Sequence, residues 1–296
     1  MIFSSPLPDV DIPDVHLTPF VFRRADDLAD EVAVIDGPSG RTVTYGQLRE
    51  SVARLAGGLA ARGFGKGDVF AIMAPNIPEY ATAFHGVASV GGINTTINPT
   101  YTAEEIEFQL RDSGARFLLT IPMFIEQATE AAGAAGVEEV FVFGEAPGAT
   151  PFAALLEADP FTGFADVDSR EDLVALPYSS GTTGLPKGVM LTHQNLAANL
   201  AQGEHALEME DREVIVAVLP FFHIYGMEIL MNGVLYNGGT AVTMPRFDLE
   251  EFLRIIQEHR VTRAYVVPPI VLALAKHPLV DQFDLSSLRT VFSGAA

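Results

Sequence analysis

The residue types best suited to chemistry are concentrated between residues 178 and 188, which read Tyr-Ser-Ser-Gly-Thr-Thr-Gly-Leu-Pro-Lys-Gly. Glycines let the backbone bring N–H groups close to an anion, and hydroxyls can donate to phosphate oxygens. Lys187 adds a mobile positive charge. The segment predicts a phosphate-binding loop made of Ser179, Ser180, Gly181, Thr182, Thr183, Gly184 and Lys187.

The surroundings of this loop also suit phosphate binding. Apolar residues at 173–176 and 188–191 predict a strand on each side, and Thr192 with Asn195 predicts the start of a helix. The common P-loop needs Gly-Lys followed by Ser or Thr, whereas here Pro186 precedes Lys187 and Gly188 follows it. This disfavours the usual kinase and ATPase class but not nucleotide binding. The alternative is a solvated linker, although linkers seldom place so ordered a series between two strands.

His223 is the second candidate for chemistry. It follows a predicted strand at 214–219, so it lies near the carboxyl edge of a sheet, where open α/β sheets bind ligands. The alternative is a hydrogen-bonded core histidine. His16, His205 and His259 have polar neighbours in sequence and are predicted to be surface residues. No metal site is expected at His223, because no second histidine or carboxylate stands nearby at ligand spacing.

The chain resembles the adenylate-forming superfamily, which includes acyl-CoA and aryl-CoA ligases, beetle luciferases and the adenylation domains of non-ribosomal peptide synthetases. Residues 179–188 resemble its phosphate-binding signature. Further similarity, closest to the 4-coumarate–CoA ligase branch, lies in Leu-Pro-Phe-Phe-His-Ile-Tyr-Gly at 219–226, in residues 267–276 and 284–289, and in Ser-Gly-Ala-Ala at 293–296. The resemblance covers nearly the whole chain and is weakest before Thr42.

The resemblance implies an ATP-dependent carboxylic acid–CoA ligase that uses ATP, Mg²⁺ and coenzyme A. The acid's carboxylate would attack the α-phosphate to give acyl-AMP and pyrophosphate, and the thiol of coenzyme A would then displace AMP. The loop from Ser179 to Lys187 would hold the β- and γ-phosphates. His223 would gate the acid pocket and orient the carboxylate.

The resemblance also implies an acid pocket and a coenzyme A contact. Tyr225, Ile229, Phe292 and Ala295 match pocket positions, and Arg246 matches a basic position that contacts coenzyme A phosphates. Tyr225 could instead pack on a helix face, and Arg246 could be a solvated arginine at a helix start. Phe292 stands where many plant coumarate ligases carry lysine, and Ile229 where they tend to carry a small polar residue. We therefore expect a more apolar pocket, suited to cinnamate-like, benzoate-like or medium-chain fatty acids.

The alternation of predicted strands and helices indicates an α/β fold with two mostly parallel sheet lobes flanked by helices. The first lobe is expected at about 20–145 and a loop-rich link at 146–170. The phosphate loop and second lobe follow at 171–296. Strands are predicted at 69–73, 115–121, 139–143, 214–219, 240–244, 262–267 and 289–292; helices are predicted at 47–61, 77–90, 102–112, 124–134, 224–235 and 249–259.

Composition narrows the partners. The chain has 296 residues, a formal net charge of −20 and no cysteine. Such acidity opposes binding to nucleic acid or anionic membranes, although not binding of one nucleotide at a local loop. No apolar run has the length of a transmembrane segment, and no signal pattern begins the chain, so a cytoplasmic location is predicted.

The resemblance further predicts that these residues are the N-terminal part of an AMP-binding domain, incomplete at its C-terminus. Expected beyond residue 296 are the acidic residue for magnesium, the aspartate for the ribose, and a small mobile domain with the adenylation lysine. The isolated chain is therefore expected to make no acyl-AMP. Two alternatives stay open: another adenylating enzyme, luciferase-like or loading a carrier protein, and a non-catalytic nucleotide-binding fragment.

Overall fold

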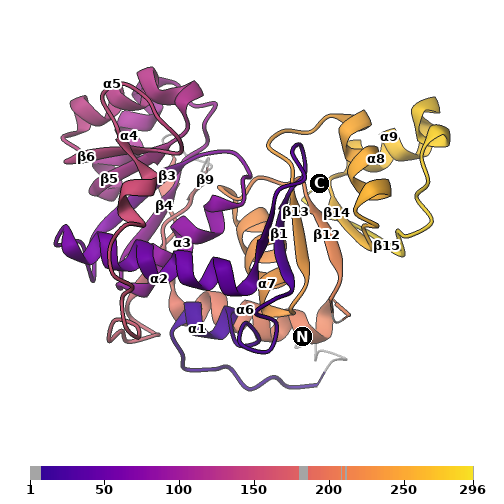
Figure 1. Ribbon diagram of the computed structural model, residues 1–296, viewed down its shortest axis with the longest axis horizontal. Helices are drawn as coiled ribbons and strands as arrows, with labels where there is room; N and C mark the ends of the chain where they lie inside the picture. The colour runs from indigo at the N-terminus through magenta and orange to yellow at the C-terminus, as the bar shows by residue number, and fades with distance from the viewer. Residues whose placement is uncertain (1–7, 180–185, 208, 211, 296) are drawn as a thin grey trace, which may run out of the picture.

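The computed structural model describes residues 8–179, 186–207, 209–210 and 212–295. Two open sheets, each covered by helices, form two lobes that lie beside one another (Figure 1). This confirms the predicted α/β class with two mostly parallel sheets. None of the helices in the described ranges is long and apolar enough to cross a membrane.

The first sheet, called the β3 sheet here, lies in the lobe that contains α4 and α5. Its order is β11-β8-β4-β3-β5-β6-β7, and only β11 pairs antiparallel with its neighbour. The strands are β3 (Val69–Met73), β4 (Ile93–Thr96), β5 (Ala115–Thr120), β6 (Glu139–Val142), β7 (Thr150–Pro151), β8 (Leu173–Ala175) and β11 (Leu191–Thr192).

The second sheet, called the β12 sheet, has the order β15-β14-β12-β13-β1-β2, and only β2 is antiparallel. Its strands are β1 (Val32–Asp36), β2 (Thr42–Thr44), β12 (Val214–Ala217), β13 (Thr240–Thr243), β14 (Arg263–Val266) and β15 (Thr290–Ser293). A separate two-stranded antiparallel ribbon joins β9 (Tyr178–Ser179) to β10 (Lys187–Gly188).

The helices are α1 (Leu17–Val21), α2 (Tyr45–Ala61), α3 (Glu79–Ser89), α4 (Ala103–Ser113), α5 (Ile125–Ala135), α6 (His193–Ala206), α7 (Val234–Tyr236), α8 (Leu249–Glu258) and α9 (Pro268–Lys276). Short 3₁₀ turns are η1 (Pro122–Phe124), η2 (Phe152–Leu155) and η4 (Pro278–Gln282). The predicted capping signals are confirmed: Thr102 and Glu105 form a capping box on α4, and Thr192 and Asn195 form one on α6.

The two sheets exchange segments of the chain. Strands β1 and β2, from the N-terminal part, join the β12 sheet through parallel pairing of β1 with β13. Strands β8 and β11, from the second half, join the β3 sheet. The sheets therefore do not divide the chain at one point between residues 145 and 171. One consequence matters for the site: the predicted phosphate loop is attached to the β3 sheet, and His223 follows the β12 sheet.

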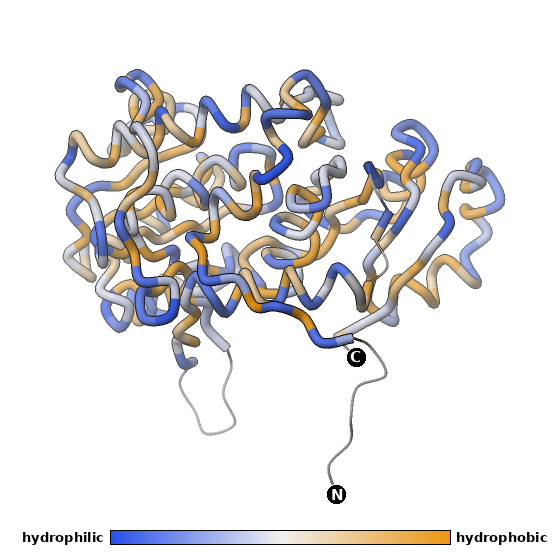
Figure 2. Tube along the Cα trace, turned by 90° about the horizontal axis from the view of Figure 1, so that it is seen from below, coloured by the Kyte–Doolittle hydropathy of each residue, from blue (hydrophilic) through white to orange (hydrophobic). Residues whose placement is uncertain are grey.

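The central strands hold the core. All five residues of β3 and all four of β14 are buried, as expected for parallel strands covered on both faces. Hydrophobic stretches run through the interior of both lobes, and hydrophilic ones lie mainly at the outer turns (Figure 2). The helix predicted at 224–235 forms, but its middle is the π-helix η3 (Gly226–Gly233). Such wide turns are often found at functional sites.

Candidate functional site

The carboxyl edges of the two sheets meet at the segment that carries His223. This segment leaves β12, and its backbone is bonded to side chains that follow β3 and end β4. Asn76 accepts a hydrogen bond from the Phe221 N–H at 2.7 Å, and the Thr96 hydroxyl donates to the Phe222 carbonyl at 2.7 Å. Ligands bind at such edges in open α/β sheets. The meeting of the two edges therefore marks the candidate site.

His223 lies at this meeting point with an exposed side chain. Its Nδ1 accepts a hydrogen bond from the Tyr225 N–H at 3.2 Å, its own N–H donates to the Pro220 carbonyl, and its carbonyl accepts from Met227. In a neutral ring whose Nδ1 is an acceptor, the proton is on Nε2. The ring can therefore present an Nε2–H donor to an anion.

Tyr225 and Ile229, two predicted pocket residues, line one cavity of about 330 Å³ together with Leu191, Asn195, Leu196, Asn199, Ile224 and Glu228. The Tyr225 hydroxyl is buried, and this burial raises the pKa of the phenol. A Cβ added to Gly294 would lie 3.1 Å from that hydroxyl, so the end of β15 packs closely against Tyr225. The structure thus brings together residues that are far apart in sequence.

Glu228 is a polar group that the sequence analysis missed in this region. Its side chain is buried, and Asn232 donates a hydrogen bond to its Oε2 at 2.9 Å. Burial raises the pKa of this carboxyl to about 8, partly opposed by the bond from Asn232. The wall that holds Ile229 is therefore not purely apolar, because the buried carboxyl group of Glu228 directly precedes Ile229 in the chain.

Phe292 and Ala295 lie at and beyond the end of the edge strand β15. The Phe292 ring is 41% exposed and packs against Tyr265, with 5.5 Å between ring centroids. Phe292 is not among the residues that line the cavity beside Tyr225. Ala295 has a φ of +56°, a left-handed conformation that is strained for a residue with a Cβ. Backbone strain of this kind is often found at functional sites.

The predicted phosphate loop is described only at its stem. Ser179 pairs with Lys187 across the β9–β10 ribbon, and both side chains are exposed. Ser180, Gly181, Thr182, Thr183 and Gly184 lie outside the described residues.

Side chains of the β3 lobe hold this stem on the side nearer β8. The Tyr178 hydroxyl donates to Asp112 of α4 at 2.6 Å, and the Thr95 hydroxyl donates to the Leu176 carbonyl at 2.9 Å. The base of the loop is thus fixed to the β3 sheet and to α4.

Arg246 lies in the bend after β13, with an exposed side chain. Two residues later Asp248 caps α8 by accepting a hydrogen bond from Glu251. Strands β12, β13 and β15 run in the same direction within one sheet. His223, Arg246 and Ala295 each follow the carboxyl end of one of these strands. Their side chains therefore come from the same edge of that sheet.

Three histidines cluster between α1, α3 and α6, near the amino end of β8, where the His193 N–H donates to the Asp172 carbonyl. The rings of His16 and His193 are 4.5 Å apart, His193 accepts a hydrogen bond from Leu17, and His85 is fully buried beside Thr18. Burial lowers the pKa of His16 to about 4 and those of His85 and His193 to about 3. The prediction that His16 is a surface residue was wrong. Its ring is half-buried against His193, and its Nε2 forms a hydrogen bond with the Ala88 carbonyl at 3.0 Å.

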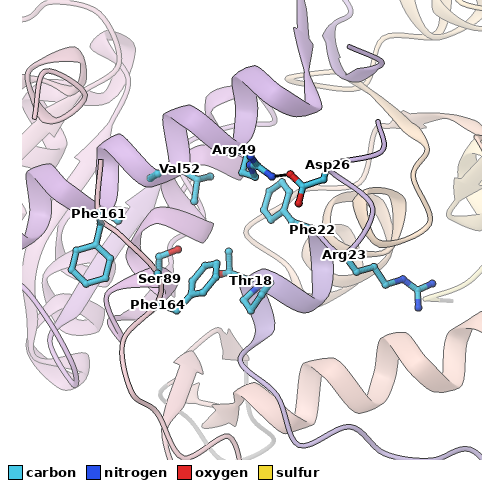
Figure 3. Close-up of a pocket in the computed structure, with 13 residues that line it drawn as sticks. Thr18, Phe22, Arg23, Asp26, Arg49, Val52, Ser89, Phe161 and Phe164 are labelled. Atoms are coloured by element: carbon cyan, nitrogen blue, oxygen red, sulfur yellow. Dashed lines mark ion pairs between the residues drawn. The ribbon is translucent and has the colours of Figure 1, made fainter. Parts of the chain in front are cut away.

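A further cavity of about 400 Å³ lies between α1, α2 and the segment at 161–164 (Figure 3). The rings of Phe22, Phe161 and Phe164 line it, and an ion pair between Arg49 and Asp26 lies beside it. Thr18 and Ser89 also line it, but their hydroxyls already contact His85. None of the predicted site residues lines this cavity, so the chemistry is not expected there.

Within the described ranges, no group of three or more histidine, aspartate or glutamate side chains could hold a metal ion. The described residues therefore do not form a protein cage for Mg²⁺.

The sequence analysis missed Asn76, Thr96 and Asp112 as well as Glu228. A signal for Asn76 was available, because Ala-Pro-Asn-Ile-Pro at 74–78 follows the buried strand β3 directly. A polar residue held between two prolines at a carboxyl edge is typical of a fixed functional loop. No local pattern distinguishes Asp112 or Glu228 from other acidic residues on helices.

Comparisons with known proteins agree with this geometry. The family model described as "AMP-binding enzyme" matches residues 21–296. The chain is 40% identical to 4-coumarate–CoA ligase 1 of Petroselinum crispum and 41% identical to 4-coumarate–CoA ligase 3 of Oryza sativa. The whole chain is covered in both, but it covers only 55% and 54% of those proteins. The chain thus spans about half the length of these curated relatives.

Solved structures show the same fold. A long-chain fatty-acid–CoA ligase from Archaeoglobus fulgidus superposes with a TM-score of 0.91 at 28% identity, over 99% of this chain and 60% of that one. A red-emitting luciferase from Phrixothrix hirtus gives a TM-score of 0.89 at 23% identity, over 96% of this chain and 72% of that one. The arrangement is that of the N-terminal domain of adenylate-forming enzymes, as the sequence predicted.

Proposed function

The chain belongs to the family of AMP-binding enzymes. We propose that it is part of an ATP-dependent carboxylic acid–CoA ligase, which forms an acyl-AMP and then an acyl-CoA thioester. One observation carries the proposal: His223, with Nδ1 engaged and Nε2–H available, lies where the sheet edge that holds it meets the sheet that holds the phosphate-loop stem. ATP and coenzyme A would be its nucleotide and thiol substrates, and Mg²⁺ would arrive with the triphosphate.

Electrostatic repulsion explains why the phosphate loop and His223 would have separate roles. A carboxylate that attacks an α-phosphate is repelled by the triphosphate, and charge builds on the β- and γ-phosphates as pyrophosphate leaves. The loop from Ser179 to Lys187 would bind those phosphates through backbone N–H groups, hydroxyls and the lysine charge. His223 would donate from Nε2 to an oxygen of the carboxylate and so orient the other oxygen for attack.

For the acid, we propose an aromatic, cinnamate-like molecule or a medium-chain fatty acid. The cavity of about 330 Å³ beside Tyr225 and Ile229 supports this class, because most of its lining is apolar. Phe292 and Ala295 would close the pocket from the β15 side. Arg246 would bind phosphates of coenzyme A from the same sheet edge.

The other adenylating chemistries receive less support. The luciferase likeness is at 23% identity and shows the fold alone. The curated relatives at 38–41% identity are described as CoA ligases, which favours transfer of the acyl group to coenzyme A. A carrier-protein acceptor would predict no thioester with free coenzyme A.

ATP binding tests the nucleotide part of the proposal directly. Isothermal titration of the purified chain with ATP should give a dissociation constant that rises at least about tenfold in Lys187→Ala, as expected for loss of one charge-assisted contact. Lys276→Ala is the matched control, because Lys276 is an exposed lysine on α9 and follows no sheet edge. Equal ATP affinity in the wild type, Lys187→Ala and Lys276→Ala would contradict the proposed loop.

A further inference from the structure

We propose that Asn76 is a positioning residue for His223, and that it fixes the imidazole relative to the phosphate-loop stem by joining the two sheets. This inference rests on the proposed function of His223. Asn76 follows β3 of one sheet, whereas His223 follows β12 of the other. The side chain of Asn76 is 2% exposed, so it is part of the molecular interior.

All three hydrogen-bonding functions of Asn76 that point toward the His223 segment are used. Its Nδ2 donates to the carbonyls of Ala217 and Leu219, both at 2.8 Å, and its Oδ1 accepts from Phe221 N–H at 2.7 Å. Ala217 ends β12, and Leu219 and Phe221 lie in the bend and the turn that follow it. The Asn76 amide thus holds the segment that leads from β12 to His223 at three points along its length.

No other common side chain of this length can replace these bonds. A primary amide has two donors and an acceptor on one planar group, which is what two carbonyls and one N–H require. Aspartate would lose both donors and place a charge against two carbonyl oxygens. Alanine would leave two buried carbonyls and one N–H without this partner, and such groups are costly when unsatisfied.

The Asn76 segment is itself held rigidly. Pro75 and Pro78 flank it, and α3 begins immediately afterwards at Glu79. Tyr80, fully buried on α3, packs edge-to-face on Phe221 with 5.5 Å between ring centroids. Thr96, at the end of β4, holds the Phe222 carbonyl. His223 therefore follows two residues whose backbone or ring is bound by the β3 lobe.

The functional consequence follows from where the other half of the site is attached. The phosphate-loop stem leaves β8, and β8 pairs directly with β4 in the β3 sheet. His223 belongs to the β12 sheet. A link between the sheets at this edge sets the distance between the group that orients the carboxylate and the loop that binds phosphate. Misplacement of about 1 Å can cost about a hundredfold in rate.

Hydrogen exchange tests whether the Asn76 hydrogen bonds hold the His223 segment. In Asn76→Ala we expect amides 221–227 to exchange at least about tenfold faster, because three hydrogen bonds no longer hold the segment. Asn76→Asp keeps the acceptor for Phe221 but places a charge against the Ala217 and Leu219 carbonyls, so these amides should exchange at least as fast as in Asn76→Ala. Asn94→Ala is the matched control: Asn94 is fully buried and donates to Phe84 and Val174, away from the His223 segment. Faster exchange in both alanine variants alike would reduce Asn76 to a general stability role.

A double-mutant cycle tests the positioning role. Titrating the chain with sodium cinnamate in the presence of ATP, we expect His223→Ala and Asn76→Ala each to weaken acid binding about tenfold, and the double variant to be no weaker than His223→Ala. Additive losses, or a loss in His223→Ala but none in Asn76→Ala, would overturn the inference. No effect of His223→Ala, or no binding of either cinnamate or the medium-chain acid octanoate, would overturn the proposed function instead. Hydrogen exchange would still test whether Asn76 holds the His223 segment.

Discussion

The His223 segment and the stem of the predicted phosphate loop approach the site from different sheets, and they are held by groups of different burial. Asn76 and Thr96, which hold the first, are almost fully buried. The second is held at Leu176 by the buried Thr95 hydroxyl, but nearer the loop, at Tyr178, it is held by a hydrogen bond to Asp112 that is exposed to solvent. Buried hydrogen bonds fix a segment more firmly than exposed ones, because water cannot replace them. The comparison indicates a rigid acid-orienting side and a more adjustable phosphate side.

The largest effect is expected from breaking the rigid side at Gly226. A Cβ at this position would lie 2.0 Å from the Pro220 carbonyl oxygen, so η3 must move away from the His223 segment. Gly226→Ala should lower the free energy of unfolding by at least about 3 kcal/mol. Chemical denaturation measures this loss, with Gly133→Ala in the last turn of α5 as the control. A Cβ at Gly133 meets open space, and that variant should be neutral or slightly stabilising.

Acidification is expected to loosen the contacts of α1 with α3 and α6, near the amino end of the strand β8 that leads to the phosphate-loop stem. Burial holds the pKa values of His16, His85 and His193 at about 4, 3 and 3, below the value of 6.5 for an unfolded chain. Their contribution to stability is present above pH 6.5 and is lost as the pH falls toward the folded values, because the unfolded state then binds more protons. After the opposing effect of Glu228, the net loss between pH 6.5 and pH 5 should be about 3 kcal/mol.

Urea denaturation at the two pH values checks this, and His16→Gln should remove part of the loss. A transition midpoint that does not move between pH 6.5 and pH 5 would contradict neutral, buried histidines at the α1–α6 contact. The sign is opposite to that expected from Glu228 on the His223 side, and because the two effects overlap in pH, variants of each group separate them.

Glu228 provides that opposite sign. Burial raises its pKa to about 8, above the unfolded value of 4.5, so its contribution to stability is fully present below pH 4.5 and is lost as the pH rises to 8. Glu228→Gln should remove a decline of about 2 kcal/mol between pH 5 and pH 7, while keeping the bond from Asn232. Parallel pH profiles of the wild type and the variant would show that the carboxyl is charged in the folded protein.

Much of the fold could be predicted because its signals are local. Buried strands such as β3 are short apolar runs, and the capping boxes at Thr102 and Thr192 depend on residues three apart. The membership of β1 in the distant β12 sheet could not be predicted this way, because pairing with β13 depends on tertiary contacts across about two hundred residues.

The site residues follow the same pattern: those with a local sequence signal were predicted, and those defined by tertiary contacts were missed. His223 was predicted from its place after a strand, and the resemblance supplied Tyr225 and Ile229 as pocket residues. Asn76 and Glu228 were missed, because their partners lie on another strand or inside a π-helix that no residue pattern announces. The predicted roles of all these residues, and those of Lys187, Arg246, Phe292, Ala295 and the rest of the phosphate loop, stay predictions.

The smallest effect is expected where the phosphate side is held by its exposed pair. Tyr178→Phe removes the hydrogen bond to Asp112 but keeps the ring that packs against Gly188. Because solvent can replace the lost partner, stability should fall by only about 0.5 kcal/mol and the ATP dissociation constant should rise by about two- to threefold. Asp112→Asn combined with Tyr178→Phe should add nothing further, since the two variants remove the same bond. If Tyr178→Phe lowered the free energy of unfolding as much as Asn76→Ala does, the phosphate-loop stem would be held as firmly as the His223 segment. The difference in burial between their hydrogen bonds would then have no consequence for rigidity.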